Sequence, residues 1–118
     1  MITSKIGKNA EDFACMYLRN QGYVIQEQNW RFKNAEIDII CQINSLLVFV
    51  EVKSRAYTYF GEPESTIDIQ KEERIIDAAM AYMRKIKHNW AIRFDIISIQ
   101  LDSLKRPVSL KHFKDAFF

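Results

Sequence analysis

The sequence is poor in the residues that interrupt regular structure. Only three glycines and two prolines occur among 118 residues, which predicts long helices and strands joined by few loops. An excess of one charge is also lacking, because 17 basic and 15 acidic side chains leave a formal net charge of +2. This balance excludes the extended basic surface of a protein that coats nucleic acid. Any contact with nucleic acid must therefore come from local clusters of charge.

Cysteines and long apolar runs are scarce as well. Cys15 and Cys41 lie in apolar patterns and form no CxxC pair, which favours two reduced thiols in the core over a metal site. No apolar run is long enough to cross a bilayer. Residues 1–7 lack the apolar stretch of a signal peptide. We therefore expect a soluble, cytoplasmic protein that does not contact a membrane.

The sequence does contain clear helix and strand periodicities. Hydrophobic residues make up 48% of the chain, enough for one globular domain over residues 1–118. The element order predicts an α/β fold, αβββαβ, with a mixed sheet flanked by helices and the last strand parallel to the third. The expected elements are helices 5–21 and 69–87 and strands 23–31, 36–42, 46–55 and 91–101, with a short strand added after Pro107.

The second and third strands form a predicted hairpin that carries an unusual charge pattern. If Asn44-Ser45 is its two-residue loop, Asp38 lies directly opposite Glu51, and Glu36 directly opposite Lys53. Side chains of a strand alternate between its two faces. The charged residues expected on one face are Glu36, Asp38, Glu51, Lys53 and Arg55.

Asp38 and Glu51 are the core of this pattern. Opposed residues in a sheet have Cβ atoms about 4.5–5.5 Å apart, so the two carboxylates would repel each other unless a cation lay between them. Mg²⁺ binds through one or two carboxylates, waters and substrate phosphate. The alternative is a set of solvated charges on an exposed face. The apolar run LLVFVEVK around Glu51 argues against it, because isolated buried charges are costly.

Two helical residues are ambiguous from spacing alone. Glu11 lies at the edge of the apolar stripe of the first helix, and Lys71 lies one turn before Ile75 in the second. Both residues fit a role beside the hairpin face, and both also fit boundary positions whose charges remain in water.

Five blocks of the sequence resemble the YraN-like family, whose fold is similar to that of restriction endonucleases and Holliday-junction resolvases, the PD-(D/E)xK nuclease group. The resemblance extends from Gly7 through Ile99. Ala10 and Ala35 replace glycines that are usual in the family, and no proline precedes Asp38. The blocks are GKNAEDFA, AEIDII, LVFVEVKSR, FGEP and RFDIISI.

The resemblance implies a restriction-endonuclease-like core with a metal-dependent nuclease site. Asp38 and Glu51 would hold Mg²⁺ or Mn²⁺, with the carbonyl of Val52 as a further ligand. Lys53 would orient the attacking water and stabilise the charge that develops on the phosphate. Glu11 matches the helix glutamate that completes the site in resolvase-like members and could help to hold a second cation.

Four basic residues are expected to contact nucleic acid. Arg31, Lys33 and Arg55 lie near the hairpin face, and Lys71 matches a family lysine on the helix behind the sheet. The aromatic residues 57, 59 and 60 would stack on unpaired bases or, equally well, pack on the sheet edge. His88 and His112 lack ligand spacing and are interpreted as structural, and Asp95 is assigned to a salt bridge or a helix cap.

The leading functional hypothesis is a DNA endonuclease that acts on branched or damaged substrates. The alternative is a non-catalytic nucleic-acid-binding module that retains a nuclease fold. Opposed carboxylates favour catalysis, because binding alone does not require them. The small size of the chain suggests that a second copy or a protein partner is needed to grip duplex DNA.

Overall fold

The computed structural model describes residues 2–56 and 69–117, with side chains from residue 9 onward. The predicted order of elements is confirmed, including the strand after Pro107. The strand boundaries agree with the prediction to within one residue, and the first helix begins earlier than expected. The elements are α1 (Ile2–Asn20), β1 (Val24–Phe32), β2 (Ala35–Ile43), β3 (Leu46–Arg55), α2 (Ile69–Ile86), β4 (Ile92–Leu101) and β5 (Pro107–Phe113).

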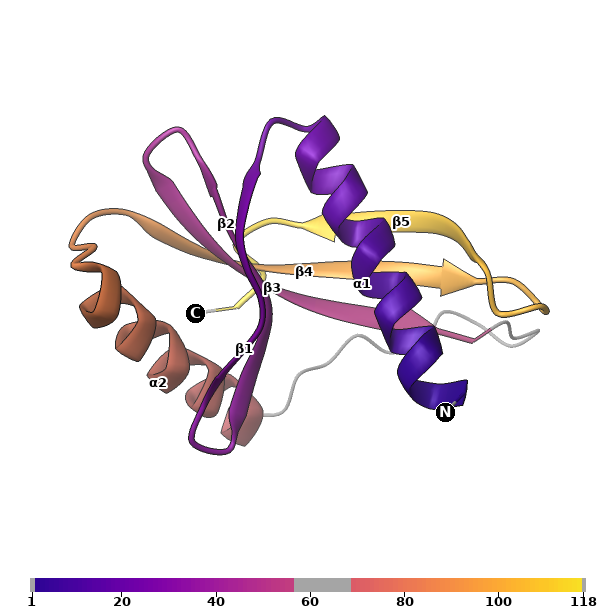
Figure 1. Ribbon diagram of the computed structural model, residues 1–118, viewed down its shortest axis with the longest axis horizontal. Coiled ribbons are helices and arrows are strands. Elements are labelled where there is room, and N and C mark those ends of the chain that lie inside the picture. The colour runs from indigo at the N-terminus through magenta and orange to yellow at the C-terminus, as the bar shows by residue number, and fades with distance from the viewer. Residues whose placement is uncertain (1, 57–68, 118) are drawn as a thin grey trace.

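The strands form one mixed sheet in the order β1-β2-β3-β4-β5 (Figure 1). The pairs β1–β2, β2–β3 and β4–β5 are antiparallel, whereas β3 and β4 are parallel. The parallel pair is connected through α2, as expected for strands that need a helical crossover. Neither described helix is long and apolar enough to span a bilayer.

The two helices pack on opposite faces of this sheet (Figure 1). On the α1 face, Ala14 and Leu18 of the helix meet Val48, Val50 and Ile97 of the strands. On the α2 face, the helix packs against Ile40 and Phe49, and Phe94 lies in the same cluster. Both faces of β3 are therefore buried over its first half, which explains its nearly continuous apolar sequence. Cys15 and Cys41 are buried and reduced, as predicted.

The β2–β3 hairpin has the predicted register over its regular part. Ile39–Ile43 pairs with Leu46–Val50, and Asn44 in the turn has φ 54°, a backbone conformation that asparagine tolerates. The paired register ends at Ile39 and Val50, one position before Asp38 and Glu51. The two strands thus separate where the charged residues begin.

The predicted pairing of Glu36 with Lys53 is wrong, because the paired register of β2 and β3 does not extend to these residues. Ala35 and Ile37 pack on the α2 face, whereas Ile39 and Cys41 pack on the α1 face. The alternation of β2 therefore changes phase at residue 38, and Glu36 lies on the α1 side. Where a strand separates from its neighbour, the side chains of the two strands need not alternate between the faces of the sheet in the same order.

Candidate functional site

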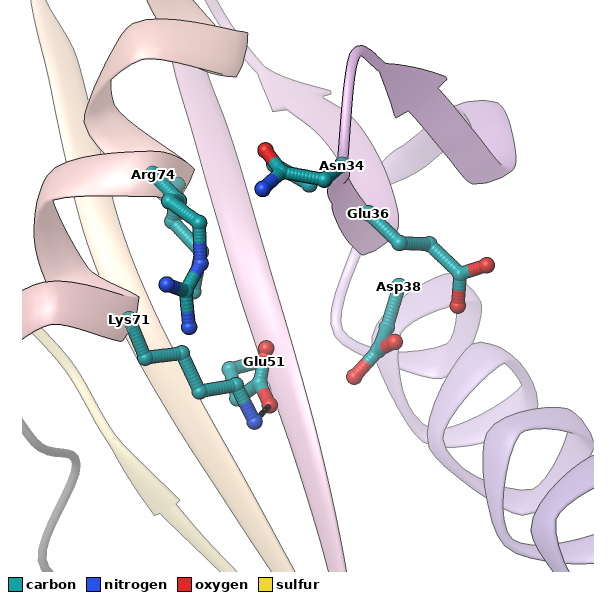
Figure 2. A pocket seen from close by; sticks show the side chains of 8 residues that line it. Asn34, Glu36, Asp38, Glu51, Lys71 and Arg74 are labelled. Carbon is teal, nitrogen blue, oxygen red and sulfur yellow. Dashed lines mark ion pairs between the residues drawn. The ribbon is translucent and has the colours of Figure 1, made fainter.

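A pocket of about 200 Å³ opens where β2 and β3 separate, beside the first turns of α2 (Figure 2). The strands β2 and β3 supply the carboxylates of the pocket, and α2 supplies its positively charged side chains. Apolar side chains hold both elements in place, because Ile75 of α2 and Ile37 of β2 belong to the same core cluster. The residues that line the pocket are Asn34, Ala35, Glu36, Asp38, Glu51, Lys71, Arg74 and Ile75.

Asp38 takes over a backbone interaction at the point of separation. If the hairpin register continued, Val52 would lie opposite Ile37. Instead, the Val52 N–H donates a hydrogen bond of 2.7 Å to Oδ2 of Asp38. This bond fixes the carboxylate and satisfies an N–H group that the separated strands would otherwise leave unpaired.

The environment of Asp38 disfavours its charged form. The pKa of the carboxyl is raised from 3.8 to about 8, first by burial and next by the negative charge of Glu51. The Val52 N–H acts in the opposite direction, and Glu11 and Glu36 raise the pKa further. A carboxylate surrounded by other carboxylates gains most from a nearby positive charge.

Glu51 already has a positive partner. It is buried, with 7% of its surface exposed, and Nζ of Lys71 lies 2.6 Å from its Oε1. The Lys71 side chain is 44% exposed, so its ammonium reaches the buried carboxylate from the solvent side. Lys71, expected to contact nucleic acid, therefore neutralises Glu51, and Arg74 beside it adds a second cation to the pocket wall (Figure 2).

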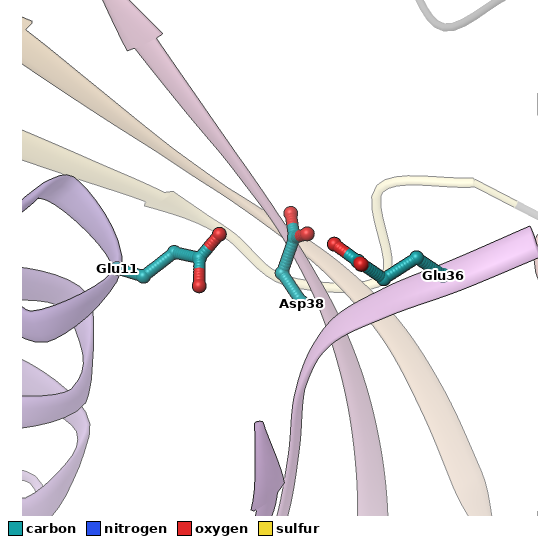
Figure 3. Close-up of side chains that lie close together, drawn as sticks. All are labelled: Glu11, Glu36 and Asp38. Carbon is teal, nitrogen blue, oxygen red and sulfur yellow. The ribbon is translucent and has the colours of Figure 1, made fainter. Parts of the chain in front are cut away.

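Glu11 of α1 and Glu36 of β2 form a second group of carboxylates with Asp38. Glu11, Glu36 and Asp38 each offer an oxygen within 4.8 Å of the other two, and Figure 3 shows Glu11 and Glu36 pointing toward Asp38 from either side. Oxygen ligands of this kind suit hard cations such as Mg²⁺ and Mn²⁺. Asp38 thus lies between Glu51 on the α2 side and Glu11 on the α1 side.

Asn29 is a site residue that the sequence analysis missed. Its side-chain amide donates to Oε1 of Glu11 at 2.8 Å and approaches Oε1 of Glu36 at 3.4 Å. Its φ of 53° lies in the left-handed region within β1, between Gln28 and Trp30, which pair with Ile39 and Ile37 of β2 on either side of Asp38. Asparagine is enriched in this left-handed region, so its presence within a strand sequence was a weak signal.

The other predicted contacts are distributed around the pocket. Arg31 is largely exposed and pairs with Glu36 at 3.0 Å, which replaces the expected pairing of Glu36 with Lys53. Lys33 lies in the β1–β2 turn with its Nζ 5.3 Å from the centre of the Phe32 ring. Residues 57, 59 and 60, predicted to stack on bases, lie outside the described residues.

Lys53, Val52 and Arg55 follow Glu51 along β3. Lys53 and Arg55 are partly buried and alternate with Val52, which packs in the α1-side cluster. They therefore share the α2 face with Glu51. Among the described residues, Lys53 is not part of the pocket lining. The Val52 N–H donates to Asp38, and the carbonyl of Val52 is the group expected to bind a metal.

Asp95 is a second buried carboxyl on the same sheet, away from the pocket. It is fully buried and forms the salt bridge that was predicted for it, with Arg93 at 2.7 Å. His112 Nε2 lies 2.7 Å from the same carboxyl, and His112 Nδ1 lies 2.9 Å from the Tyr17 hydroxyl. This network links α1, β4 and β5, which agrees with a structural role for His112.

Comparison with known proteins identifies one family. The model of the uncharacterised protein family UPF0102 matches residues 10–99. A UPF0102 protein of Phocaeicola vulgatus is 36% identical over 115 residues, which cover 98% of this chain and 93% of the relative. A UPF0102 protein of Clostridium botulinum is 40% identical over 114 residues, which cover 95% and 93%.

Proposed function

We propose that this chain, which belongs to the uncharacterised protein family UPF0102, is a metal-dependent endonuclease of the restriction-endonuclease-like class that hydrolyses phosphodiester bonds in DNA. The observation that carries the proposal is that Asp38 and Glu51 line one pocket where two strands separate. The αβββαβ order with a mixed sheet is compatible with that class of fold.

The residues of the pocket fit a divalent cation. Asp38 and Glu51 are buried or partly buried carboxyls, and their mutual repulsion contributes to the raised pKa of Asp38. Their oxygen atoms are the donors that Mg²⁺ and Mn²⁺ prefer. When bound, the cation would supply Lewis-acid chemistry, polarising a phosphoryl oxygen and acidifying the attacking water.

The side chains of the site would have separate roles in binding the cation and the phosphodiester. Asp38, fixed by the Val52 N–H, and Glu51 would hold the cation against the phosphodiester. Glu11 reaches the other side of Asp38 and would support the same cluster. Lys53 would orient the attacking water in line with the departing alkoxide and place its ammonium where negative charge grows on the phosphoryl oxygens. Lys71 and Arg74 would attract the phosphate to the pocket.

A cleavage assay tests this function. Labelled junctions, flaps, single strands and duplexes are incubated with the protein and Mg²⁺ or Mn²⁺, and single-turnover cleavage is followed. Lys53→Ala should reduce the rate about a hundredfold or more, the scale of losing one preorganised donor, and should leave affinity in Ca²⁺ within a few-fold.

A matched variant separates cleavage from non-specific charge effects. Lys85 is exposed in the last turn of α2, so Lys85→Ala should cut at the wild-type rate. If the wild type binds branched DNA and cuts none of the substrates with either metal, the endonuclease assignment is wrong, and the nucleic-acid-binding module becomes the better account.

A further inference from the structure

The second halves of β3 and β4, together with the part of β5 that pairs with β4 there, have one packed face and one polar face. Side chains on the α1 face are apolar and belong to the α1-side cluster, among them Val52, Ile97 and Ile99. Side chains between them along the strands point to the α2 face. Because α2 packs on β1 and β2, the α2 face of β4 and β5 extends beyond this helix (Figure 1).

The strand register fixes which polar residues are neighbours on the α2 face. Lys53 is paired with Ser98, and Ser98 with Lys111. The next row, toward the end of β3, joins Arg55, Gln100 and Ser109. We call these six residues the cationic face: Lys53, Arg55, Ser98, Gln100, Ser109 and Lys111.

The cationic face adjoins the candidate site directly. The row before it joins Glu51, Ile96 and Phe113, so Glu51 of the pocket lies one row from Lys53. Three of the six residues carry a positive charge and none carries a negative charge. Net charge on the whole chain is small, so this local excess of cations is the kind of cluster that attracts phosphates.

An aromatic side chain and a hollow lie at the border of the cationic face. Phe113 is 44% exposed at the end of β5. A hollow of about 480 Å³ opens beside it, lined by Ile96, His112, Phe113, Lys114 and Ala116. An exposed ring beside an open hollow and a lysine can stack on a nucleobase while a neighbouring phosphate is neutralised.

We propose that the cationic face binds a single strand of nucleic acid, with phosphates near Lys111 and Arg55 and a base on Phe113. This proposal rests on the proposed endonuclease function and specifies where its substrate lies. The strand would cross β5, β4 and β3 and reach the pocket at Glu51. Lys111 and Phe113 then become substrate-binding residues outside the site described above.

The shape of the face favours a single strand over a duplex. Neighbouring strands lie about 4.8 Å apart, so Lys111 and Lys53, on β5 and β3, are separated by the width of two strand spacings. Both cations and the ring project from one sheet surface. Sheet surfaces that bear aromatic and basic side chains bind unstacked bases, whereas duplex grooves are read by inserted helices or ribbons.

Binding without catalysis tests the proposal and keeps it separate from the proposed function. The probe is a fluorescently labelled DNA of about twelve nucleotides, within the range of known single-strand sites, used alone and annealed as a duplex, in EDTA. Phe113→Ala should weaken single-strand binding about fivefold or more, the effect of losing one stacked base. Lys111→Ala should lower the slope of log affinity against log salt by about 0.7, the loss of one phosphate contact.

Lys85→Ala, on exposed α2 surface, is the matched control and should bind as the wild type does. Circular dichroism melting checks that each variant is folded. If Lys111→Ala and Phe113→Ala retain wild-type affinity and salt slope, or if the wild type binds the duplex as tightly as the single strand, the proposal is wrong. If the wild type binds the single strand in preference to the duplex but cuts no substrate with Mg²⁺ or Mn²⁺, the endonuclease function is wrong and this proposal still stands.

Discussion

Asp95 and Asp38 are two aspartates of one sheet in opposite electrostatic surroundings. Asp95 accepts hydrogen bonds from Arg93 at 2.8 and 2.7 Å and from the Asp115 N–H at 3.0 Å, and His112 lies 2.7 Å away. Burial alone would raise the pKa of Asp95, but these hydrogen bonds outweigh it and lower the pKa. Its negative charge is therefore fully compensated within the protein.

Asp38 has one backbone donor, the Val52 N–H, and three carboxyl neighbours. Burial and the charge of Glu51 raise its pKa to about 8. The opposite pKa shifts of Asp95 and Asp38 distinguish two kinds of buried carboxyl group. A carboxylate that is fully paired within the protein, as Asp95 is, joins structural elements. A carboxyl surrounded by other carboxyls, as Asp38 is, favours binding of an external cation.

The largest expected difference between the two residues concerns stability. Asp95→Ala should lower the free energy of unfolding by about 3–5 kcal/mol, because it leaves the largely buried Arg93 without its partner. Asp38→Asn should not destabilise the metal-free protein at neutral pH, because the raised pKa of Asp38 keeps its carboxyl largely protonated there and an asparagine oxygen can still accept the Val52 N–H bond. Urea unfolding in EDTA measures both, and similar losses in the two variants would contradict the distinction.

The pH dependence of the free energy of unfolding should differ between the wild type and Asp38→Asn. Because the pKa of Asp38 in the folded protein, about 8, lies above the ordinary 3.8, the folded state binds the proton more tightly. This contribution to stability is fully present below pH 4 and is lost as pH rises toward 8, by up to about 1.4 kcal/mol per pH unit. Asp38→Asn should show a flatter profile between these values in urea unfolding without metal. Equal profiles would show that Asp38 does not titrate in this window.

A smaller effect is expected from the ammonium that lies at Glu51. Lys71 and a divalent cation would compete for this carboxylate, since Nζ lies 2.6 Å from Oε1. Lys71→Met should therefore strengthen Mn²⁺ binding about fivefold, which corresponds to about 1 kcal/mol, the upper end for ion pairs with an exposed partner. Calorimetric titration measures the affinity, and weaker binding in the variant would mean that Lys71 supports the cation site.

The smallest effect should come from the outer end of the Asp95 network. Tyr17→Phe removes the hydroxyl that lies 2.9 Å from His112 Nδ1, which should cost about 1 kcal/mol of stability. The variant should respond to Mn²⁺ as the wild type does, because this network is separate from the pocket. A changed metal response would show that the two regions are coupled.

The sequence predicted the elements and the paired part of the hairpin, because apolar periodicity and the Asn44-Ser45 turn are local signals. It also predicted the proximity of Asp38 and Glu51. It could not predict that the strands separate there, since the left-handed backbone of Asn29 in β1 and the phase change of β2 depend on packing against both helices. The predicted pairing of Glu36 with Lys53 was wrong for the same reason.

The contacts between the helices and the sheet could not be predicted from the spacing of residues along the sequence either. Lys71 was recognised as lying in line with the apolar face of its helix, but its pairing with Glu51 depends on how α2 docks on the sheet. The convergence of Glu11 on Asp38 depends in the same way on α1. Such long-range contacts are set by tertiary packing. The periodicity of apolar residues within one segment carries no information about them.

The thermal stability of wild type, Asp38→Asn and Asp95→Asn with and without millimolar Mn²⁺ tests the central claim most directly, because it requires no knowledge of the substrate. Binding to the folded state alone raises the melting temperature. The cation should raise it by several degrees in the wild type and in Asp95→Asn, and leave it unchanged in Asp38→Asn. An equal rise in Asp38→Asn would contradict the assignment of Asp38 and Glu51 as the metal site.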